Sequence, residues 1–174
     1  MKKSAKAKKP LKKTKAVKKA TDQNDILEII LKDHKPLKKL IKTMKNSEAT
    51  LPELRKAFSE FAPLLLNHAK PEEKALYVPM KERDSDIRTE GFEGDTEHHI
   101  ADGLIEEIKA TTDKDEWRAR VKVLAELVEH HIEEEEEDMF KDVRKEFDLE
   151  ERVEMGQEYS RLYQDFSGEV LAAA

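Results

Sequence analysis

The chain has 174 residues, of which 41% are charged and 37% hydrophobic, with five glycines and no cysteine. This composition favours a single helical domain with narrow apolar stripes and argues against a sheet-rich fold. The lack of cysteine excludes disulfides, thiolate metal sites, iron–sulfur clusters and thiol catalysis. No apolar stretch approaches the roughly 20 residues of a membrane span, and the N-terminus lacks the apolar core of a secretory signal, so a cytoplasmic protein is expected.

The first residues differ from the rest of the chain. Residues 1–20 contain ten lysines and no acidic residue, although the whole chain has a net charge of −6, so the remainder is strongly acidic. A segment rich in lysine, alanine and proline cannot bury enough surface to fold alone, and we expect a disordered tail at 1–21 ahead of a domain at 22–174. The tail is either a solvating segment or a contact for a polyanion such as nucleic acid, polyphosphate or an anionic membrane.

The first half of the domain contains start signals for two helices. Asp22 or Asn24 can cap a helix over residues 25–46. Thr50 is followed by leucine and proline, which is a typical helix start, and the second helix is expected to reach residue 82.

Three more helices are expected in the second half. A loop at 84–95, which holds two glycines, precedes a third helix over 95–111, with a start a few residues before 95 as the alternative. A fourth helix begins at residue 112 or 113 and extends to 147. Asp148 and Glu151 form a capping box for a short fifth helix that ends near residue 166. Four long amphipathic helices with short connections predict an all-α fold, an antiparallel up-down four-helix bundle with a short C-terminal fifth helix.

Each of the four long helices carries one histidine on its apolar stripe. In the fourth helix, apolar residues at steps of three and four lead to His131 and then to Glu135 one turn further, whereas His130 points about 100° away. The second helix repeats this pairing with His68 and Glu72. The residues predicted to face the core are His34, His68, Glu72, His98, His131 and Glu135.

This inward set predicts a metal site. A single histidine on an apolar face is usually an ordinary core residue. Four such histidines together with two glutamates do not fit that interpretation, because carboxylates are costly to bury without a partner. Six nitrogen and oxygen donors suit two octahedral ions, with the carboxylates as bridges. Iron fits best and manganese next, since zinc normally takes four ligands. The apolar wall of the site is expected to be Phe58, Phe61, Leu65 and Leu124.

The sequence resembles the hemerythrin-like, or HHE cation-binding, family over residues 24–147. The matching segments are LKDHKPLKKLI, LLLNHAKPEEKALY, TEHHIADGLIEEI and VLAELVEHHIEEEEEDMF, which give the order H…HxxxE…H…HxxxE. The resemblance implies a non-haem di-iron site, bridged by an oxo or hydroxo group, with O2, NO or peroxide as its ligand.

Two features depart from the family pattern. Oxygen-carrying members have a second histidine one turn after the third-helix ligand, where this chain has Asp102. Asp102 is a candidate seventh ligand, a partner of His98 or a surface residue. Pro71 lies between His68 and Glu72, and a kink there would move Glu72 away from the site.

Several residues are candidates for supporting roles. His130, Asp102, Glu73 and Tyr77 are candidate partners of the ligands, and the glutamates at 133, 136 and 137 are expected to form a solvated face. Two functions remain open: a protein that binds or senses O2, NO or iron, and a di-iron enzyme that removes hydrogen peroxide. A third hypothesis is an iron-responsive module that the lysine-rich tail tethers to a polyanion.

Overall fold

The structure, a computed structural model, describes residues 24–173, with side chains as far as residue 167. Every regular element in that range is helical. The elements are α2 (Ile26–Met44), α3 (Leu51–Glu72), η1 (Glu73–Tyr77), α4 (Val78–Lys81), α5 (Ile87–Ala110), α6 (Lys114–Glu134), η2 (Glu135–Met139), α7 (Phe140–Glu146) and α8 (Leu149–Ala173). The π-helical turns η1 and η2 continue directly into α4 and α7. The expected tail at 1–21 lies outside the described residues.

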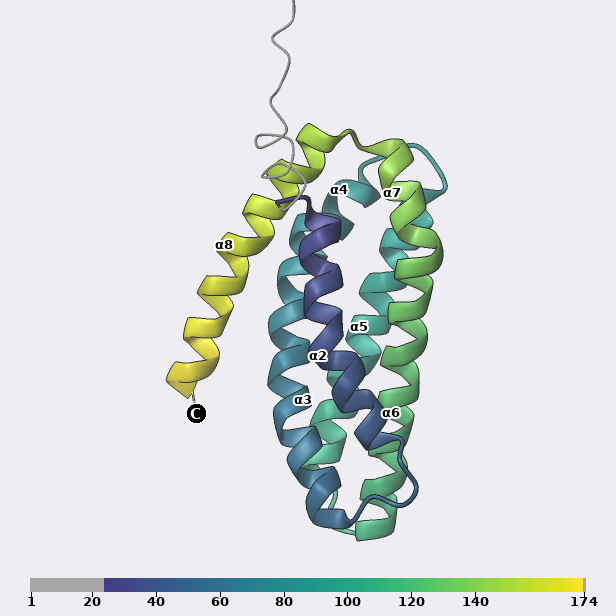
Figure 1. Ribbon diagram of the computed structural model, residues 1–174, viewed down its shortest axis with the longest axis vertical. Coiled ribbons are helices and arrows are strands. Elements are labelled where there is room, and N and C mark those ends of the chain that lie inside the picture. Colours follow the sequence, from purple (N-terminus) through teal and green to yellow (C-terminus); the bar gives the residue numbers. More distant parts are fainter. Residues whose placement is uncertain (1–23, 174) are drawn as a thin grey trace, which may run out of the picture.

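Four long helical stretches lie side by side along the length of the molecule (Figure 1). The connections from α2 to α3 and from α5 to α6 lie at one end, and α4 with the turn into α5 lies at the other. The predicted all-α fold is confirmed for the described residues, which contain no strand. None of their helices is long and apolar enough to cross a membrane.

Local side-chain caps explain where the helices begin. Asp25, rather than Asp22 or Asn24, caps α2 by accepting a hydrogen bond from the backbone N–H of Leu27 at 3.1 Å. The helix start predicted at Thr50 is confirmed, since α3 begins at Leu51. Glu53, which was not among the predicted capping residues, accepts hydrogen bonds from the backbone N–H and the hydroxyl of Thr50. The predicted capping box of Asp148 and Glu151 is also present, with reciprocal backbone-to-side-chain bonds of 2.8 and 3.0 Å.

The loop predicted at 84–95 is wrong, because α5 already begins at Ile87. Its two glycines do not mark a turn; they let α5 approach the preceding helix closely. Gly94 is buried, and a Cβ atom there would lie 2.6 Å from Cζ of Tyr77. The glycine pattern therefore reports close packing between helices rather than a break in the chain.

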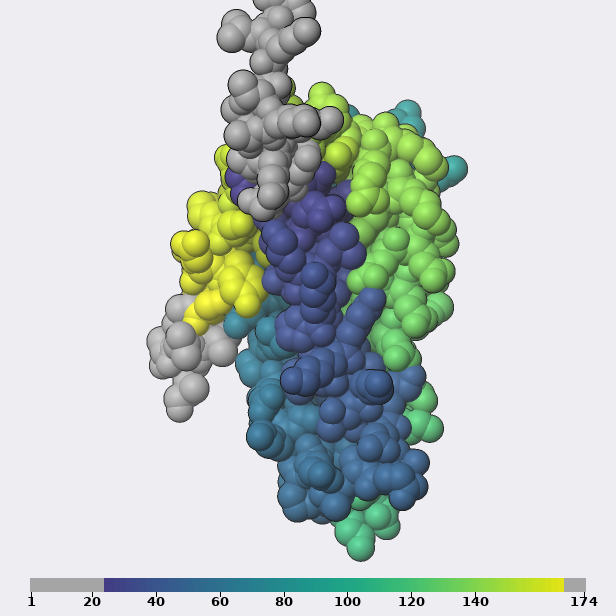
Figure 2. All heavy atoms as spheres, in the orientation of Figure 1, coloured from purple at the N-terminus to yellow at the C-terminus, as the bar shows by residue number. Residues whose placement is uncertain are grey.

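The fifth helix is longer than predicted, because α8 extends to Ala173 instead of ending near 166. It packs against α2 and α3, and its Tyr159 is buried. Figure 2 shows α8 lying directly against the N-terminal half of α2. Gly156 permits this approach, since a Cβ atom there would lie 2.0 Å from the carbonyl oxygen of Asn24.

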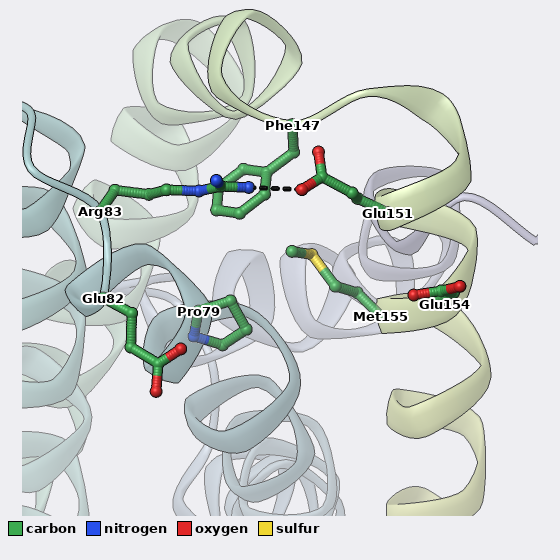
Figure 3. A pocket seen from close by; sticks show the side chains of 7 residues that line it. All are labelled: Pro79, Glu82, Arg83, Phe147, Glu151, Glu154 and Met155. Atoms are coloured by element: carbon green, nitrogen blue, oxygen red, sulfur yellow. Dashed lines mark hydrogen bonds and ion pairs between the residues drawn. The ribbon is translucent and has the colours of Figure 1, made fainter.

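A pocket lies where α4 and the first turns of α8 meet (Figure 3). Arg83 lies over the ring of Phe147, with its Cζ atom 4.1 Å from the ring centroid, and donates a hydrogen bond of 2.6 Å to Glu151. Arg152 bonds both Asp25 at the start of α2, at 3.0 Å, and the carbonyl of Phe147. These contacts fix the first turns of α8 to the end of the bundle.

The prolines in α3 do not displace the site. Pro63 and Pro71 both lie inside the helix, yet the helix continues into η1 and Glu72 is fully buried. The π-helical turn begins directly after Glu72, two residues beyond Pro71, so the break in regular α-helical bonding follows the inward pair His68 and Glu72 rather than separating it.

Two apolar clusters divide the interior along the bundle axis. One contains Phe58, Phe61, Leu65 and Leu124 and lies toward the α2–α3 connection. The other contains Ile26, Ile30, Tyr77 and Tyr159 and lies toward α4. The buried histidines and glutamates of the described residues lie between the two clusters along the helices: His34, for example, follows Ile30 and precedes Leu37. The site is therefore enclosed by apolar side chains on two sides.

Candidate metal centre

The six residues predicted to face the core come together in one buried cluster. They are contributed by α2, α3, α5, α6 and the first position of η2, and none is more than 3% exposed. The cluster contains His34, His68, Glu72, His98, His131 and Glu135.

These residues form two groups of three. In one group, donor atoms of His34, His68 and Glu135 all lie within 4.8 Å of one another; in the other, the same holds for Glu72, His98 and His131. Each group thus offers two imidazole nitrogens and one carboxylate oxygen, which is a donor set that could hold a metal cation.

Both glutamates face histidines of both groups. Glu72 Oε2 lies 3.2 Å from Nε2 of His68 and 3.8 Å from Nε2 of His98. Glu135 presents Oε2 to Nε2 of His34 at 3.2 Å and Oε1 to Nε2 of His131 at 3.6 Å. The two carboxylates therefore lie between the groups, where they could bridge two cations.

Several inward atoms have no hydrogen-bond partner in the described structure. They are Nε2 of His34, Nε2 of His68, both oxygens of Glu72 and Oε2 of Glu135. A buried polar atom without a partner costs about 1–3 kcal/mol, so the set as a whole is strongly unfavourable unless something bonds to it. These atoms include a donor from every residue of the group of His34, His68 and Glu135, and from Glu72 of the other group, and this fits a bound cation.

Three of the four histidines have a hydrogen-bond partner on the outward nitrogen. Nδ1 of His34 lies 2.9 Å from Glu136, Nδ1 of His68 lies 3.1 Å from the Tyr159 hydroxyl, and Nδ1 of His131 lies 2.6 Å from Glu97. Nδ1 of His98 faces Glu73 at 3.6 Å, which is too long for a hydrogen bond. Partners on Nδ1 direct the Nε2 lone pair inward, an arrangement that recurs in metal sites and fixes the ring orientation.

Glu136 was predicted to be solvated, and this prediction is wrong. Its carboxylate contacts both His34 and Nζ of Lys38, which lies 2.7 Å away. A π-helical turn begins at Glu135, and such a turn rotates each following residue by less than an α-helix does, so the α-helical phase no longer holds at Glu136. Glu133 and Glu137 are exposed, as predicted.

A buried tyrosine adjoins the second group. The Tyr77 hydroxyl donates a 2.6 Å hydrogen bond to Oε1 of Glu135 and lies 3.4 Å from Nε2 of His131. Burial, and then the charge of Glu135, raises the pKa of Tyr77 well above its ordinary value, so the hydroxyl keeps its proton. Tyr77 therefore holds a proton donor inside the cluster.

The two carboxylates differ in their affinity for a proton. Burial, and then the neighbouring charge of Glu135, raises the pKa of Glu72 well above its ordinary value. Burial also acts to raise the pKa of Glu135, but the charge of His131 and the contact with His34 outweigh it and lower that pKa. Without a cation, Glu72 therefore holds a proton more tightly than Glu135 does.

The other candidates from the sequence lie further out. Asp102 belongs to neither group; it contacts Nζ of Lys70 at 2.6 Å, and the same lysine contacts Glu73 at 2.8 Å. Asp102 thus reaches His98 only through Lys70 and Glu73. His130 is exposed and lies beside Glu134.

Sequence reasoning missed Asp33, Glu97, Glu136 and Tyr159 as partners of the cluster. A signal for three of them is present: Asp33 and Glu97 directly precede inward histidines, and Glu136 directly follows an inward glutamate. An acidic residue directly beside an inward ligand was the pattern to look for, although His68 and His131 have none. Tyr159 has no such signal, because it contacts His68 across 91 positions of the chain.

The fold and the site define a class of protein: a helical bundle whose core presents histidine and glutamate donors suited to metal cations. The family model of the hemerythrin HHE cation binding domain matches residues 25–143, which is more than half of the chain. The chain belongs to that family, and membership points to binding of a metal cation. Searches among curated proteins and among solved structures each found no match.

Proposed function

We propose that this chain is a non-haem di-iron protein that binds O2 or NO at the buried cluster of an antiparallel four-helix bundle. The observation that carries the proposal is the set of inward donor atoms without hydrogen-bond partners, arranged as two groups with a carboxylate between them. The proposed ligands are the six residues of the cluster, His34, His68, Glu72, His98, His131 and Glu135.

The donor set favours iron among the common metals. Four imidazole nitrogens and two carboxylates form a hard-to-intermediate set without thiolate. Six donors shared by two octahedral ions leave positions free for an exogenous ligand, whereas zinc normally completes its coordination with four ligands. Manganese is the next choice. When bound, a pair of iron ions supplies redox-active and exchangeable positions for a small ligand.

The protein itself supplies enclosure and orientation. The two apolar clusters limit the entry of water from both ends of the bundle. The partners on Nδ1 of the histidines hold the rings in one orientation. The Tyr77 hydroxyl donates a hydrogen bond to Glu135 and so orients its carboxylate.

One cavity gives access to the cluster from the surface. It has a volume of about 160 Å³ and is lined by His131 and Glu135 at its inner end. Its other lining residues include the acidic side chains of Glu90, Glu93, Glu97, Glu134 and Asp138. An acidic cleft raises the local concentration of cations, so it suits the entry of Fe²⁺ as well as a small neutral ligand.

A second candidate function is the removal of hydrogen peroxide. The observation that favours it is Tyr77, because a hydrogen-bond donor assists O–O cleavage at the departing oxygen, and the Tyr77 hydroxyl places one beside Glu135 and His131.

Metal analysis and spectroscopy on the full chain test both candidates. We expect about two irons per chain and a spectrum that changes reversibly with O2 or NO. Steady evolution of oxygen from added peroxide would instead support the enzyme. A protein that takes up no iron from anaerobic Fe²⁺ contradicts both.

The lysine-rich residues 1–20 carry a separate proposal, since a basic segment of this kind suits a polyanion. Deleting them should weaken binding to nucleic acid or polyphosphate and leave the metal content unchanged. Equal binding after the deletion would remove the idea.

A further inference from the structure

The fifth helix lies outside the matched family domain but reaches its site. The family match ends at residue 143, whereas Tyr159 belongs to α8. Tyr159 is 1% exposed, and its hydroxyl lies 3.1 Å from Nδ1 of His68 and 2.8 Å from Oδ2 of Asp33. A side chain from beyond the family domain thus contacts one residue of the cluster directly.

The direction of these hydrogen bonds follows from their partners. A hydroxyl has one proton to donate, and three acceptors lie near that of Tyr159: the Asp33 carboxylate at 2.8 Å, the His68 carbonyl at 3.4 Å and the His68 ring. A bond to a carboxylate is shorter and roughly twice as strong as one to a neutral acceptor. The proton therefore goes to Asp33, and the oxygen accepts a hydrogen bond from Nδ1–H of His68.

This direction fixes the tautomer of His68. With its proton on Nδ1, the ring presents an unprotonated Nε2, which faces Glu72 and has no hydrogen-bond partner. If Tyr159 instead donated to Nδ1, the ring proton would lie on Nε2 and block the donor atom. Asp33 selects the tautomer with the proton on Nδ1, because it accepts the hydrogen bond that the Tyr159 hydroxyl donates.

We propose that Tyr159 is a positioning residue of the metal centre, which holds His68 in its metal-binding tautomer through a chain from Asp33 to Tyr159 to His68. The fifth helix, α8, thus contributes a residue that orients one of the proposed metal ligands. The inference rests on the proposed function for its consequence in metal affinity, but the tautomer of His68 can be measured without metal.

The test compares Tyr159→Phe with Tyr163→Phe in the full chain. Tyr163 is a matched control because it lies one turn further along α8 and its ring stacks on that of Tyr159, with centroids 6.2 Å apart. Long-range ¹H–¹⁵N NMR of the histidine rings, recorded on chelator-treated protein, reports the tautomer. Titration with Fe²⁺ under anaerobic conditions reports the affinity.

We expect Nδ1 of His68 to carry the proton in the wild-type chain and in Tyr163→Phe. Tyr159→Phe should mix the tautomers and weaken Fe²⁺ binding by about 10- to 100-fold, as is usual for loss of a partner of a metal-binding histidine. Asp33→Ala should move the ring proton to Nε2 with Tyr159 still present. A merely structural role for Tyr159 predicts no such reversal.

The outcomes separate this inference from the proposed function. If Tyr159→Phe leaves both the tautomer and the Fe²⁺ affinity at wild-type values, the inference is overturned. The same holds if wild-type His68 carries its proton on Nε2. If no variant binds Fe²⁺, including the wild-type chain, the proposed function fails, and the tautomer data alone still decide the role of Tyr159. If Tyr159→Phe does not fold, the tautomer of His68 in Asp33→Ala tests the inference: a proton on Nε2 supports it, and a proton that stays on Nδ1 overturns it.

Discussion

The Nε2 atoms of His98 and His131 lie 3.0 Å apart in the core, closer than two unprotonated nitrogens would settle. Nδ1 of His131 donates a hydrogen bond to Glu97 at 2.6 Å, so in the neutral ring its Nε2 atom carries a lone pair. The short separation therefore needs either a proton on one of the two Nε2 atoms or a cation between the rings. These two nitrogens belong to one of the two proposed metal-binding groups.

His131→Ala should lose at least about half of the bound iron, because it removes one of three donors in its group. His130→Ala is the matched control, since His130 is the adjacent histidine but is exposed. It should retain nearly all of the iron. Elemental analysis after desalting measures both, and equal losses in the two variants would contradict the assignment of His131 as the ligand.

The positions of the inward residues could be predicted because α-helical phase holds as far as His131. Apolar residues at steps of three and four fix the face of each helix, and the six polar residues on those faces are buried together. Beyond Glu135 the same argument fails at Glu136, since the π-helical turn alters the phase and nothing in the sequence EEEEED marks it.

Contacts between residues far apart in the chain, and close packing between helices, could not be predicted from the sequence. Gly91 and Gly94 read as a loop because glycine marks turns and tight packing alike, and only the position of Tyr77 distinguishes the two. The contact of Tyr159 with His68 depends on how α8 folds back along α2 and α3, which no local pattern specifies.

Glu136→Gln should weaken Fe²⁺ binding by about 10-fold or more, because the neutral amide is a poorer acceptor for Nδ1–H of His34 and no longer attracts Lys38. Glu137→Gln removes the same charge at the next position of the chain, where the side chain is exposed. It should leave the affinity unchanged within about twofold. Anaerobic Fe²⁺ titration compares them, and a matching loss in both variants would indicate a general effect of charge.

Gly94→Ala should destabilise the fold by about 1–3 kcal/mol, because the new Cβ atom would lie 2.6 Å from the buried ring of Tyr77. Displacement of that ring should also break the hydrogen bond from Tyr77 to Glu135. Gly103→Ala is the control: it lies in the same helix, α5, with open space around it. It should stabilise the fold by about 0.5–1 kcal/mol. Urea unfolding at fixed pH gives both values.

Glu90 should make the stability of the fold depend on pH. Its carboxyl lies in the access cavity near Asp142, and burial, followed by the charge of Asp142, raises the pKa of Glu90 to about 7. Lys145 lowers the pKa of Asp142, so Asp142 is the charged partner and Glu90 holds the proton. A raised carboxyl pKa means that the folded chain binds this proton more tightly than the unfolded chain does.

The contribution of Glu90 is therefore fully present below its unfolded pKa of 4.5 and is lost as pH rises to about 7. Solvent screening of this half-exposed group limits the loss to about 1 kcal/mol. Glu90→Gln should thus raise the free energy of unfolding by about 1 kcal/mol at pH 8 and change it little at pH 4.5. Urea unfolding of chelator-treated protein across this range measures the difference, with Glu60→Gln, an exposed position outside the cavity, as control. A constant difference between Glu90→Gln and the wild-type chain at all pH values would show that Glu90 does not titrate in this window.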